Sequence, residues 1–312
     1  MKILITGTEG FIGSHLAEFL IGKAEVIAIT RNVKNIKNIK HLENKIELAE
    51  CDINDKQKIT SIIKKSKPEI VFHMAAQSFV MPSWKDPEQT FRTNIFGTFY
   101  ILEALRQMKG KPIVSVACSS AEYGLNYKNE IPTKETKEFR PSSPYAVSKV
   151  TTDMLAYLYW RAYGMKTIRL RFFNTTGPRK TGSAIAEWAQ GIAEIEKGKK
   201  NELRVGNLTS IVDYTDVRDS IKAMWLLTKK RKFGEAYNIC TGKGYKMKYI
   251  LDVLKGLSTG EIKVVVDPNK IRPSDDPVFI GDNSKLRKLG WKPKIPLEET
   301  LKDTLNYWRK MV

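Results

Sequence analysis

Short apolar runs alternate with longer segments of helical periodicity in the first part of the chain. The runs have the length of buried strands, and between them apolar residues recur at the spacing of one helix face. Because parallel strands need a crossover connection, this alternation predicts a doubly wound parallel sheet covered by helices. We expect strands at 2–6, 25–30, 45–50, 69–73, 112–118 and 167–172, and helices at 11–20, 56–65, 87–107 and 144–163.

The pattern loosens after residue 173, and proline-containing stretches at 267–277 and 293–296 interrupt it. The chain therefore predicts an α/β fold in two parts. Residues 1–173, to which 212–241 return, form the sheet domain, and residues 174–211 with 242–312 form a smaller mixed α/β C-terminal substrate lobe. In this later region we expect helices at 185–197, 217–228, 246–257 and 297–308, and short strands at 236–240 and 263–266.

The composition is that of an ordinary globular protein, with 42% hydrophobic and 28% charged residues among 312. No apolar run reaches the roughly 18 residues that a membrane span needs. The N-terminus shows no signal-peptide pattern. Cys51, Cys118 and Cys240 are far apart among apolar residues, which is typical of core positions in a reducing compartment. We expect a cytoplasmic protein with no membrane partner.

The charge balance is strongly basic, at 53 Lys and Arg against 34 Asp and Glu, a formal net charge of +19. Such a charge is compatible with nucleic acid, an acidic membrane or small anions as partners. The lysines are spread widely, with local clusters at 34–40, 197–200 and 229–232, and no aromatic residues interleave them as in single-strand binding surfaces. This favours a solvated basic surface that attracts diphosphate ligands, with no nucleic-acid partner.

A glycine-rich turn stands between the first expected strand and the first expected helix. Gly7, Gly10 and Gly13 have the spacing G-x-x-G-x-x-G, with Phe11 and Ile12 opening the helix. Glycines let the backbone approach a pyrophosphate, whose charge is favourable at a helix N-terminus. The turn predicts a Rossmann-type dinucleotide site that Gly7, Gly10, Phe11, Ile12 and Gly13 line.

The end of the second expected strand bears on the choice of cofactor. NAD enzymes usually carry an acidic residue there for the ribose hydroxyl, but this chain has Thr30 followed by Arg31. A guanidinium can bind a 2′-phosphate, so we expect NADP(H) rather than NAD(H); alternatively, Arg31 belongs only to a basic surface loop. Asp52 and Ile53 follow the third strand and suit an adenine pocket, although Asp52 is also an ordinary turn residue.

A tyrosine and a lysine four residues apart carry the catalytic chemistry we expect. Tyr145 and Lys149 share one face of the helix at 144–163, so both side chains can reach one site. A tyrosine has an ordinary pKa of about 10, and we expect the lysine cation and an oxidised nicotinamide to favour the phenolate and lower that pKa towards the working range. Ser119 and Ser120 end the preceding strand, where a hydroxyl can bond a reacting sugar oxygen or simply satisfy the backbone.

Taken together, these residues resemble the extended short-chain dehydrogenases/reductases of the nucleotide-sugar epimerase/dehydratase group. Within the group the chain is most similar to GDP-4-keto-6-deoxy-mannose reductases, and next to GDP-mannose 4,6-dehydratases. The resemblance covers nearly the whole chain through the motifs at 7–13, 73–76, 94, 97–98, 119–124, 143–149, 171–174, 205–208, 213–219, 237–238, 272–282 and 290–293.

The resemblance implies roles for particular residues. Ser119, Tyr145 and Lys149 would form the catalytic triad, with Lys149 also touching the nicotinamide ribose. Asn174 would face the sugar diphosphate and Arg272 would bind a phosphate. The substrate would be a nucleotide-diphosphate sugar, and we expect it to be GDP-linked. The aromatics at 91–102 and 157–163 would build a homodimer through a helical bundle or, alternatively, lie in the core. Further cofactor contacts are expected from Ala75, Ala76, Asn94 and Phe172, and further substrate contacts from Gln77 and Ser120.

Two positions depart from the family pattern. Dehydratases carry a glutamate two residues before the tyrosine of the Tyr-Gly pair, whereas this chain has Ala121 there and Glu122 one place later. A methyl group cannot transfer protons, so dehydration is disfavoured. Val212 stands where an arginine usually precedes the Asp-Tyr pair, so a diphosphate contact must come from another cation. The candidates are Arg179, Lys180 and Arg204.

These observations favour an NADPH-dependent reductase acting at C4 of a GDP-4-keto-6-deoxy-hexose. The same residues would serve a nucleotide-sugar 4-epimerase, and a GDP-mannose 4,6-dehydratase is a further alternative. A non-enzymatic dinucleotide-sensing regulator is the remote one, because Ser119, Tyr145 and Lys149 are all present. No pattern of metal ligands is apparent, so we expect no metal.

Overall fold

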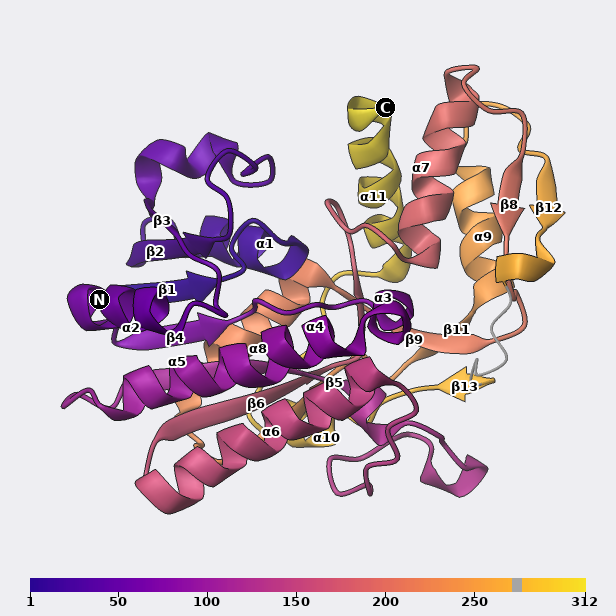
Figure 1. The fold of residues 1–312 in the computed structure, drawn as a ribbon. Helices are drawn as coiled ribbons and strands as arrows, with labels where there is room; N and C mark the ends of the chain where they lie inside the picture. The colour runs from indigo at the N-terminus through magenta and orange to yellow at the C-terminus, as the bar shows by residue number, and fades with distance from the viewer. Residues whose placement is uncertain (271–276) are drawn as a thin grey trace. The chain divides into compact units, whose positions relative to one another are not determined.

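The computed structural model describes residues 1–270 and 277–312. They divide into two compact units, of which the first comprises residues 1–125, 135–172 and 221–238. Its centre is a seven-stranded sheet in the order β10-β6-β5-β4-β1-β2-β3, and the ladders from β3 to β6 are parallel. The strands are β1 (Lys2–Thr6), β2 (Glu25–Thr30), β3 (Glu47–Glu50), β4 (Ile70–His73), β5 (Ile113–Ser119), β6 (Lys166–Phe172) and β10 (Ala236–Ile239) (Figure 1).

Helices cover this sheet on both faces, which confirms the predicted doubly wound α/β fold. On one face α2, α5 and α6 share an apolar core with the strands. Elsewhere in this unit Phe19 of α1 contacts Trp225 of α8, with ring centroids 6.1 Å apart. The helices are α1 (Phe11–Leu20), α2 (Lys56–Ser66), α3 (Val80–Lys85), α4 (Pro87–Phe91), α5 (Gly97–Arg106), α6 (Pro144–Tyr163) and α8 (Val217–Lys230).

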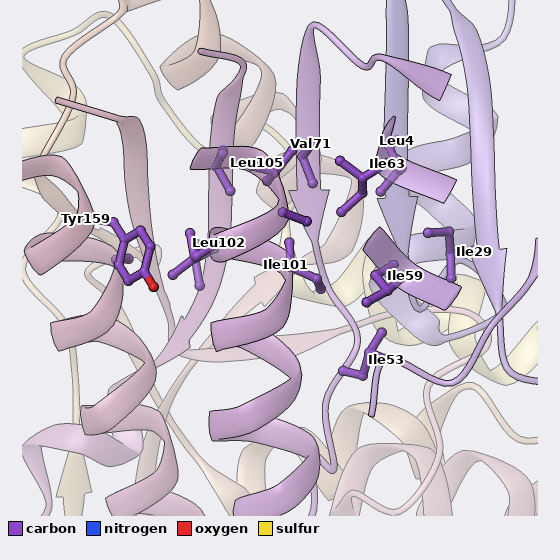
Figure 2. Close-up of a cluster of buried hydrophobic side chains, with 14 of the residues drawn as sticks. Leu4, Ile29, Ile53, Ile59, Ile63, Val71, Ile101, Leu102, Leu105 and Tyr159 are labelled. Carbon is purple, nitrogen blue, oxygen red and sulfur yellow. The ribbon is translucent and has the colours of Figure 1, made fainter. Parts of the chain in front are cut away.

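The core of the first unit is built from β-branched and leucine side chains. Figure 2 shows Ile101, Leu102 and Leu105 of α5 gathered with Val71 of β4 and Ile63 of α2. Each is at most 1% exposed. Burying an aliphatic side chain of this size contributes about 1.5–3 kcal/mol. This packing fixes the strands whose carboxyl ends carry the candidate site.

One expected helix differs from the prediction. The segment 87–107 is not a single α-helix, because a π-helical turn at Arg92–Phe96 separates α4 from α5. A π turn inserts one residue and rotates the following face, and such turns are frequent at functional sites. Here the turn carries Asn94, which is 1% exposed.

The second unit comprises residues 126–134, 173–220 and the described part of 239–312. Strand β9 (Ile211–Asp216) is its centre, paired with β7 (Asn174–Thr176), β11 (Gly244–Lys246) and β13 (Val278–Phe279), and β8 (Leu203–Val205) pairs with β12 (Val264–Val266). Trp188, Leu254 and Leu301 lie in its apolar core. Its helices are α7 (Ala184–Glu196), α9 (Met247–Gly256), α10 (Ser284–Arg287) and α11 (Leu297–Met311).

In the described parts of the chain, every helix is too short or too polar to cross a lipid bilayer.

Candidate active site

The glycine turn after β1 is shaped by two close backbone approaches. Gly7 has a φ of 67°, in the left-handed region, and a Cβ there would stand 2.8 Å from the Cα of Ala75. A Cβ on Gly13 would stand 2.2 Å from the carbonyl oxygen of Gly7. Gly10 precedes α1 and caps it without a side-chain hydrogen bond. The turn thus has the backbone form that brings a helix N-terminus against a pyrophosphate, with Phe11 and Ile12 partly buried in the first turn.

A buried hydrogen-bond relay holds the end of β4 against this turn. The Ala75 N–H donates to Thr6 Oγ1 (3.1 Å), which bonds His73 Nδ1 (2.8 Å). His73 Nε2 bonds Thr98 Oγ1 (2.9 Å), and Thr98 donates to the Asn94 carbonyl (2.6 Å). Burial, with a smaller effect of the Lys149 cation, lowers the pKa of His73 to about 3. The imidazole is therefore neutral, and the relay fits a proton on Nε2.

Asn94 joins the segment after β4 to α6. Its amide exchanges two hydrogen bonds with the backbone of Gln77, at 2.8 and 3.0 Å, and donates to Ser148 Oγ at 2.9 Å. Ala75 and Ala76 lie partly buried between these anchors. The Asn94 side chain is therefore engaged with the protein, and its predicted contact with a cofactor remains a prediction.

The catalytic residues that the sequence predicts do come together. Ser119 ends β5, and Tyr145 and Lys149 lie in the first two turns of α6, which Ser143 caps through the Ala146 N–H (3.1 Å). The expected lowering of the Tyr145 pKa is wrong for the protein alone: burial raises the pKa of this phenol to about 12, against an opposing hydrogen bond with Ser119. The phenol is thus protonated at neutral pH, the form that a proton donor needs.

The Lys149 ammonium is anchored at the same strand end. It donates to the Ala117 carbonyl of β5 at 2.6 Å and is 5% exposed. Burial lowers its pKa. Phe172 pairs with Ser119 across the β5–β6 ladder and is also buried, so the side chains meet on adjacent strand ends.

The short helix after Ser119, Ser120–Tyr123, places the residues that replace the dehydratase motif. Glu122 Oε1 accepts the Ser119 N–H (2.7 Å), and Ser119 Oγ accepts the Ala121 N–H (3.1 Å), which makes a capping box. Glu122 Oε2 lies 3.5 Å from Arg171 Nε. Burial raises the pKa of Glu122 well above its usual range. Sequence reasoning missed this role, although the spacing Ser-x-x-Glu is its signature.

The same region contains a grouping of candidate metal ligands among the described residues, Cys118, Glu122 and Asp153. Two guanidinium groups already occupy its carboxylates: Arg171 Nε lies 2.9 Å and Arg169 Nη1 2.6 Å from Asp153. A further cation would be repelled by these arginines. We therefore infer that this cluster has a structural role, in which its carboxylates pair with arginines of β6.

The predicted adenosine end lies around the ends of β2 and β3. Thr30 is buried, and Arg31 is exposed with no carboxylate of the described chain at ion-pairing distance. Asp52 is exposed and accepts the Asn54 N–H at 2.9 Å, the geometry of an ordinary turn aspartate. Ile53 is buried, and a Cβ on Gly97 would stand 2.6 Å from its Cδ1.

The first unit carries two of the predicted substrate residues, Gln77 and Ser120, and the other described ones belong to the second unit. Asn174 is exposed at the start of β7, whereas Arg179 is partly buried with a φ of 73°. Arg204 is exposed on β8 and pairs with Glu202 at 3.1 Å. Burial lowers the pKa of Lys180. Arg272 lies outside the described residues.

A buried aspartate next to Val212 was not predicted from the sequence. The Asp213 carboxylate accepts hydrogen bonds from the N–H groups of Thr241 (3.0 Å), Gly242 (2.8 Å) and Gly281 (3.4 Å). These bonds tie β9 to two loops. Val212 itself packs at the edge of the apolar core, so that its side chain supplies no charge here.

Comparison with known proteins shows which family the chain belongs to. The family model described as GDP-mannose 4,6 dehydratase matches residues 4–304. The chain belongs to this family. Among relatives, a GDP-mannose 4,6-dehydratase of Vibrio cholerae is 30% identical over 96% of this chain and 91% of its own length. A GDP-6-deoxy-D-mannose reductase of Pseudomonas aeruginosa is 28% identical over 100% of this chain and 98% of its own.

Solved structures of family relatives are similar over the full length. The Pseudomonas aeruginosa protein RMD, complexed with NADPH, has a TM-score of 0.88 and 26% identity and covers 100% of this chain and 99% of its own. The UDP-glucose 4-epimerase of Thermotoga maritima has a TM-score of 0.90 and 32% identity, with the same coverage. The chain is therefore an NAD(P)-dependent enzyme of the nucleotide-sugar epimerase, dehydratase and reductase group.

Proposed function

We propose that this enzyme reduces the C4 ketone of a GDP-linked 4-keto-6-deoxy-hexose with NADPH. The observation that carries the proposal is the side chain at position 121. Dehydration needs an acid–base group there, and Ala121 supplies none. Glu122 cannot substitute, because its carboxylate is buried against the Ser119 N–H and Arg171. Ser119, Tyr145 and Lys149 remain, and reduction of a ketone requires no further proton-transfer group.

The choice of cofactor is supported by the end of β2. NADPH would supply hydride to the ketone carbon, held by the glycine turn and, at its 2′-phosphate, by Arg31. The Arg31 guanidinium has no carboxylate partner in the described chain, so it is available to an anion. The relative solved with NADPH is consistent with this choice, whereas the related 4-epimerase of Thermus thermophilus was solved with NAD.

The residues of this chain handle the oxygen of the ketone. As negative charge develops on that oxygen, the Tyr145 phenol donates its proton to it. The Ser119 hydroxyl donates a hydrogen bond to the same oxygen and so stabilises the developing charge. Lys149 is fixed on the Ala117 carbonyl and lies one helical turn after Tyr145, and its cation would favour the phenolate that remains after the transfer.

The experiment follows nicotinamide absorbance with NADPH and GDP-4-keto-6-deoxy-mannose. Loss of one NADPH for each ketone reduced is the expected result. UDP- and dTDP-linked ketosugars serve as controls for the base, and NADH for the cofactor. Absence of turnover with every ketosugar would refute the proposal.

A 4-epimerase is the second candidate, because the Thermotoga maritima epimerase is as similar in fold as the reductase. An epimerase returns the hydride to the sugar, so it needs no added reductant. Conversion of UDP-glucose or GDP-mannose to its C4 epimer without added NADPH would therefore favour this candidate over reduction.

We also propose a homodimer formed through one face of α6 and the π turn. Phe96 is 50% exposed, and Met154, Tyr157 and Leu158 of α6 are 40%, 40% and 50% exposed. Large apolar side chains gathered on one exposed face are typical of interaction surfaces.

The three cysteines are buried free thiols, which fits the reducing, cytoplasmic location we expect.

A further inference from the structure

A cavity of about 760 Å³ lies at the amino ends of the central strands of the first unit. Its lining includes the first residues of β4, β5 and β6, namely Ile70, Ile113 and Lys166. The glycine turn and Ser119 follow the carboxyl ends of β1 and β5. The cavity therefore lies at the amino ends of the strands, and the candidate active site lies at their carboxyl ends. In Figure 1 the cavity is on the side where the N-terminus is marked.

The charge of this cavity is almost entirely positive. Seven lysine and arginine side chains line it, against one carboxylate, Glu69. Glu69 is itself engaged, since its Oε1 accepts the Lys2 N–H at 3.1 Å. In the described chain, no carboxylate lies at ion-pairing distance from Lys64, Lys67 or Arg231. Like charges gathered in a concave site repel each other, and their combined electrostatic field attracts an anion into the site.

Only some of these cations can be explained by the favourable interaction of a positive charge with the C-terminus of a helix. Lys64 and Lys229 lie in the last turns of α2 and α8, where a positive charge is ordinarily favourable. Lys109, Lys111 and Lys166 lie outside helices, in the loop before β5 and at the start of β6. They reach the same hollow from other segments of the chain.

Backbone conformation adds to the case. The described non-glycine residues with positive φ are Lys67, Lys111, Arg179 and Arg231, and three of them line this cavity. Glycine adopts this conformation at less cost, by roughly 1 kcal/mol. The chain thus keeps long cationic side chains at positions where the backbone alone favours glycine.

The floor of the cavity is apolar. Pro68, Ile70 and Pro112 are buried, and Met108 and Phe233 are partly buried. The volume falls within the roughly 300–1,000 Å³ typical of small-molecule sites. A ligand that fits both parts carries several negative charges and a flat apolar ring. A membrane surface or a nucleic-acid strand would instead need a flat or extended binding face.

We infer that this cavity binds a nucleoside polyphosphate, with the phosphates on the lysines and the base on Phe233. The inference does not depend on the reaction proposed for the active site, which lies at the other edge of the sheet. Occupation of the cavity would contact the starts of β4, β5 and β6, and β5 carries the candidate catalytic residue Ser119 at its far end.

ATP is the probe, titrated calorimetrically into protein saturated with NADPH. The chain offers a matched pair of variants. Lys64→Glu with Lys229→Glu reverses two charges that line the cavity, and Lys65→Glu with Lys230→Glu reverses their sequence neighbours, which do not line it but lie in the same last helical turns. We expect the cavity variant to weaken ATP binding by about tenfold or more, and the control variant by much less.

Hydrogen exchange gives an independent readout that does not rely on substitution. ATP should slow amide exchange at 107–113 and 228–233 in the unmodified protein. Equal loss of affinity in both variants, no ATP binding at millimolar concentration, or protection confined to the glycine turn would overturn the inference. Binding of acidic vesicles or single-stranded DNA through the cavity lysines, without ATP binding, would also overturn it.

Discussion

At the scale of single residues, the candidate site depends on how buried polar groups are paired. The Ser119 hydroxyl accepts the Ala121 N–H, while Glu122 accepts the backbone N–H of Ser119 and faces Arg171. Burial without such partners would cost about 1–3 kcal/mol for each group. The polar side chains nearest the expected reacting oxygen are therefore fixed before a substrate arrives.

Replacement of Tyr145 by Phe tests the proton donor. General acid catalysis contributes about 10²–10⁴-fold, so kcat should fall by that factor while the Kd for NADPH stays unchanged. Because the phenol pKa is raised to about 12, wild-type reduction should lose no proton donor between pH 6 and 9. Steady-state kinetics and fluorescence titration measure both. Tyr157→Phe on the same helix is the control, and equal activity of the two variants would exclude the mechanism.

We expect Glu122 to position Ser119 rather than to transfer a proton, and two variants of Glu122 distinguish these roles. Glu122→Gln retains an oxygen that accepts the Ser119 N–H, so kcat should stay within a few-fold of wild type with an unchanged pH profile. Glu122→Ala removes the acceptor, and we expect kcat to fall about tenfold with NADPH binding intact. A Gln variant as impaired as the Ala variant would point to acid–base chemistry instead.

The neutral His73 makes stability depend on pH. Its folded pKa of about 3 lies below the ordinary 6.5, so protonation favours the unfolded chain. The stabilisation is fully present above pH 6.5 and is lost as pH falls from 6.5 towards 3, by up to about 1.4 kcal/mol per pH unit. Urea unfolding at pH 7.0, 6.0 and 5.5 measures this. His73→Gln should show a flatter dependence over that range, and parallel curves for the two proteins would contradict the assignment.

At the scale of elements, the junction of β1 and α1 has no room for a Cβ at Gly7 or Gly13. A methyl group on Gly13 would meet a backbone carbonyl oxygen at 2.2 Å, whereas one on Gly10 would meet the same oxygen at 3.1 Å. Gly13→Ala should therefore destabilise the protein by about 1–3 kcal/mol and weaken NADPH binding. Gly10→Ala should have a smaller effect on both. Thermal unfolding and cofactor titration compare them, and an equal effect would show that the turn relaxes.

The strands and helices of the first unit could be predicted from the sequence, because buried strands of four to seven residues and amphipathic helices have clear periods. All six strands expected before residue 173 lie within two residues of their predicted bounds. The π turn at Arg92–Phe96 could not be predicted, since one inserted residue hardly changes the apolar spacing. In the second unit five strands were missed. Two or three residues are too few to show alternation in β7, β8, β11 and β13. The longer β9 (Ile211–Asp216) was missed because polar residues occupy most of its buried positions.

Only those parts of the candidate site that carry a local sequence signal could be predicted. Ser119, Tyr145 and Lys149 carry local signals, and the structure brings them together. The relay through Thr6, His73 and Thr98 joins residues that are 67 and 25 positions apart, so no local pattern reveals it. Glu122 did carry a local signal, its spacing from Ser119, which competed with the comparison to the dehydratase motif.

At the scale of the whole molecule, assembly gives a further prediction. If the exposed face of α6 forms the proposed dimer, Leu158→Glu places charge in an apolar interface and should yield monomers. Leu125→Glu is the control, because Leu125 is also 50% exposed but lies in a loop. Light scattering after size-exclusion chromatography gives the mass of each variant. A wild-type monomer, or dissociation by both substitutions, would contradict the proposal.

The place of β10 in the sheet also has a consequence for synthesis. This strand, Ala236–Ile239, completes the sheet beside β6, and the preceding Gly234 fits so closely against Trp160 that a Cβ would stand 2.1 Å from the indole ring. While the ribosome is still translating the codons for these residues, β6 is an uncovered edge that can pair with other nascent chains. A newly made copy is thus exposed to misassembly until about three quarters of it has left the exit tunnel.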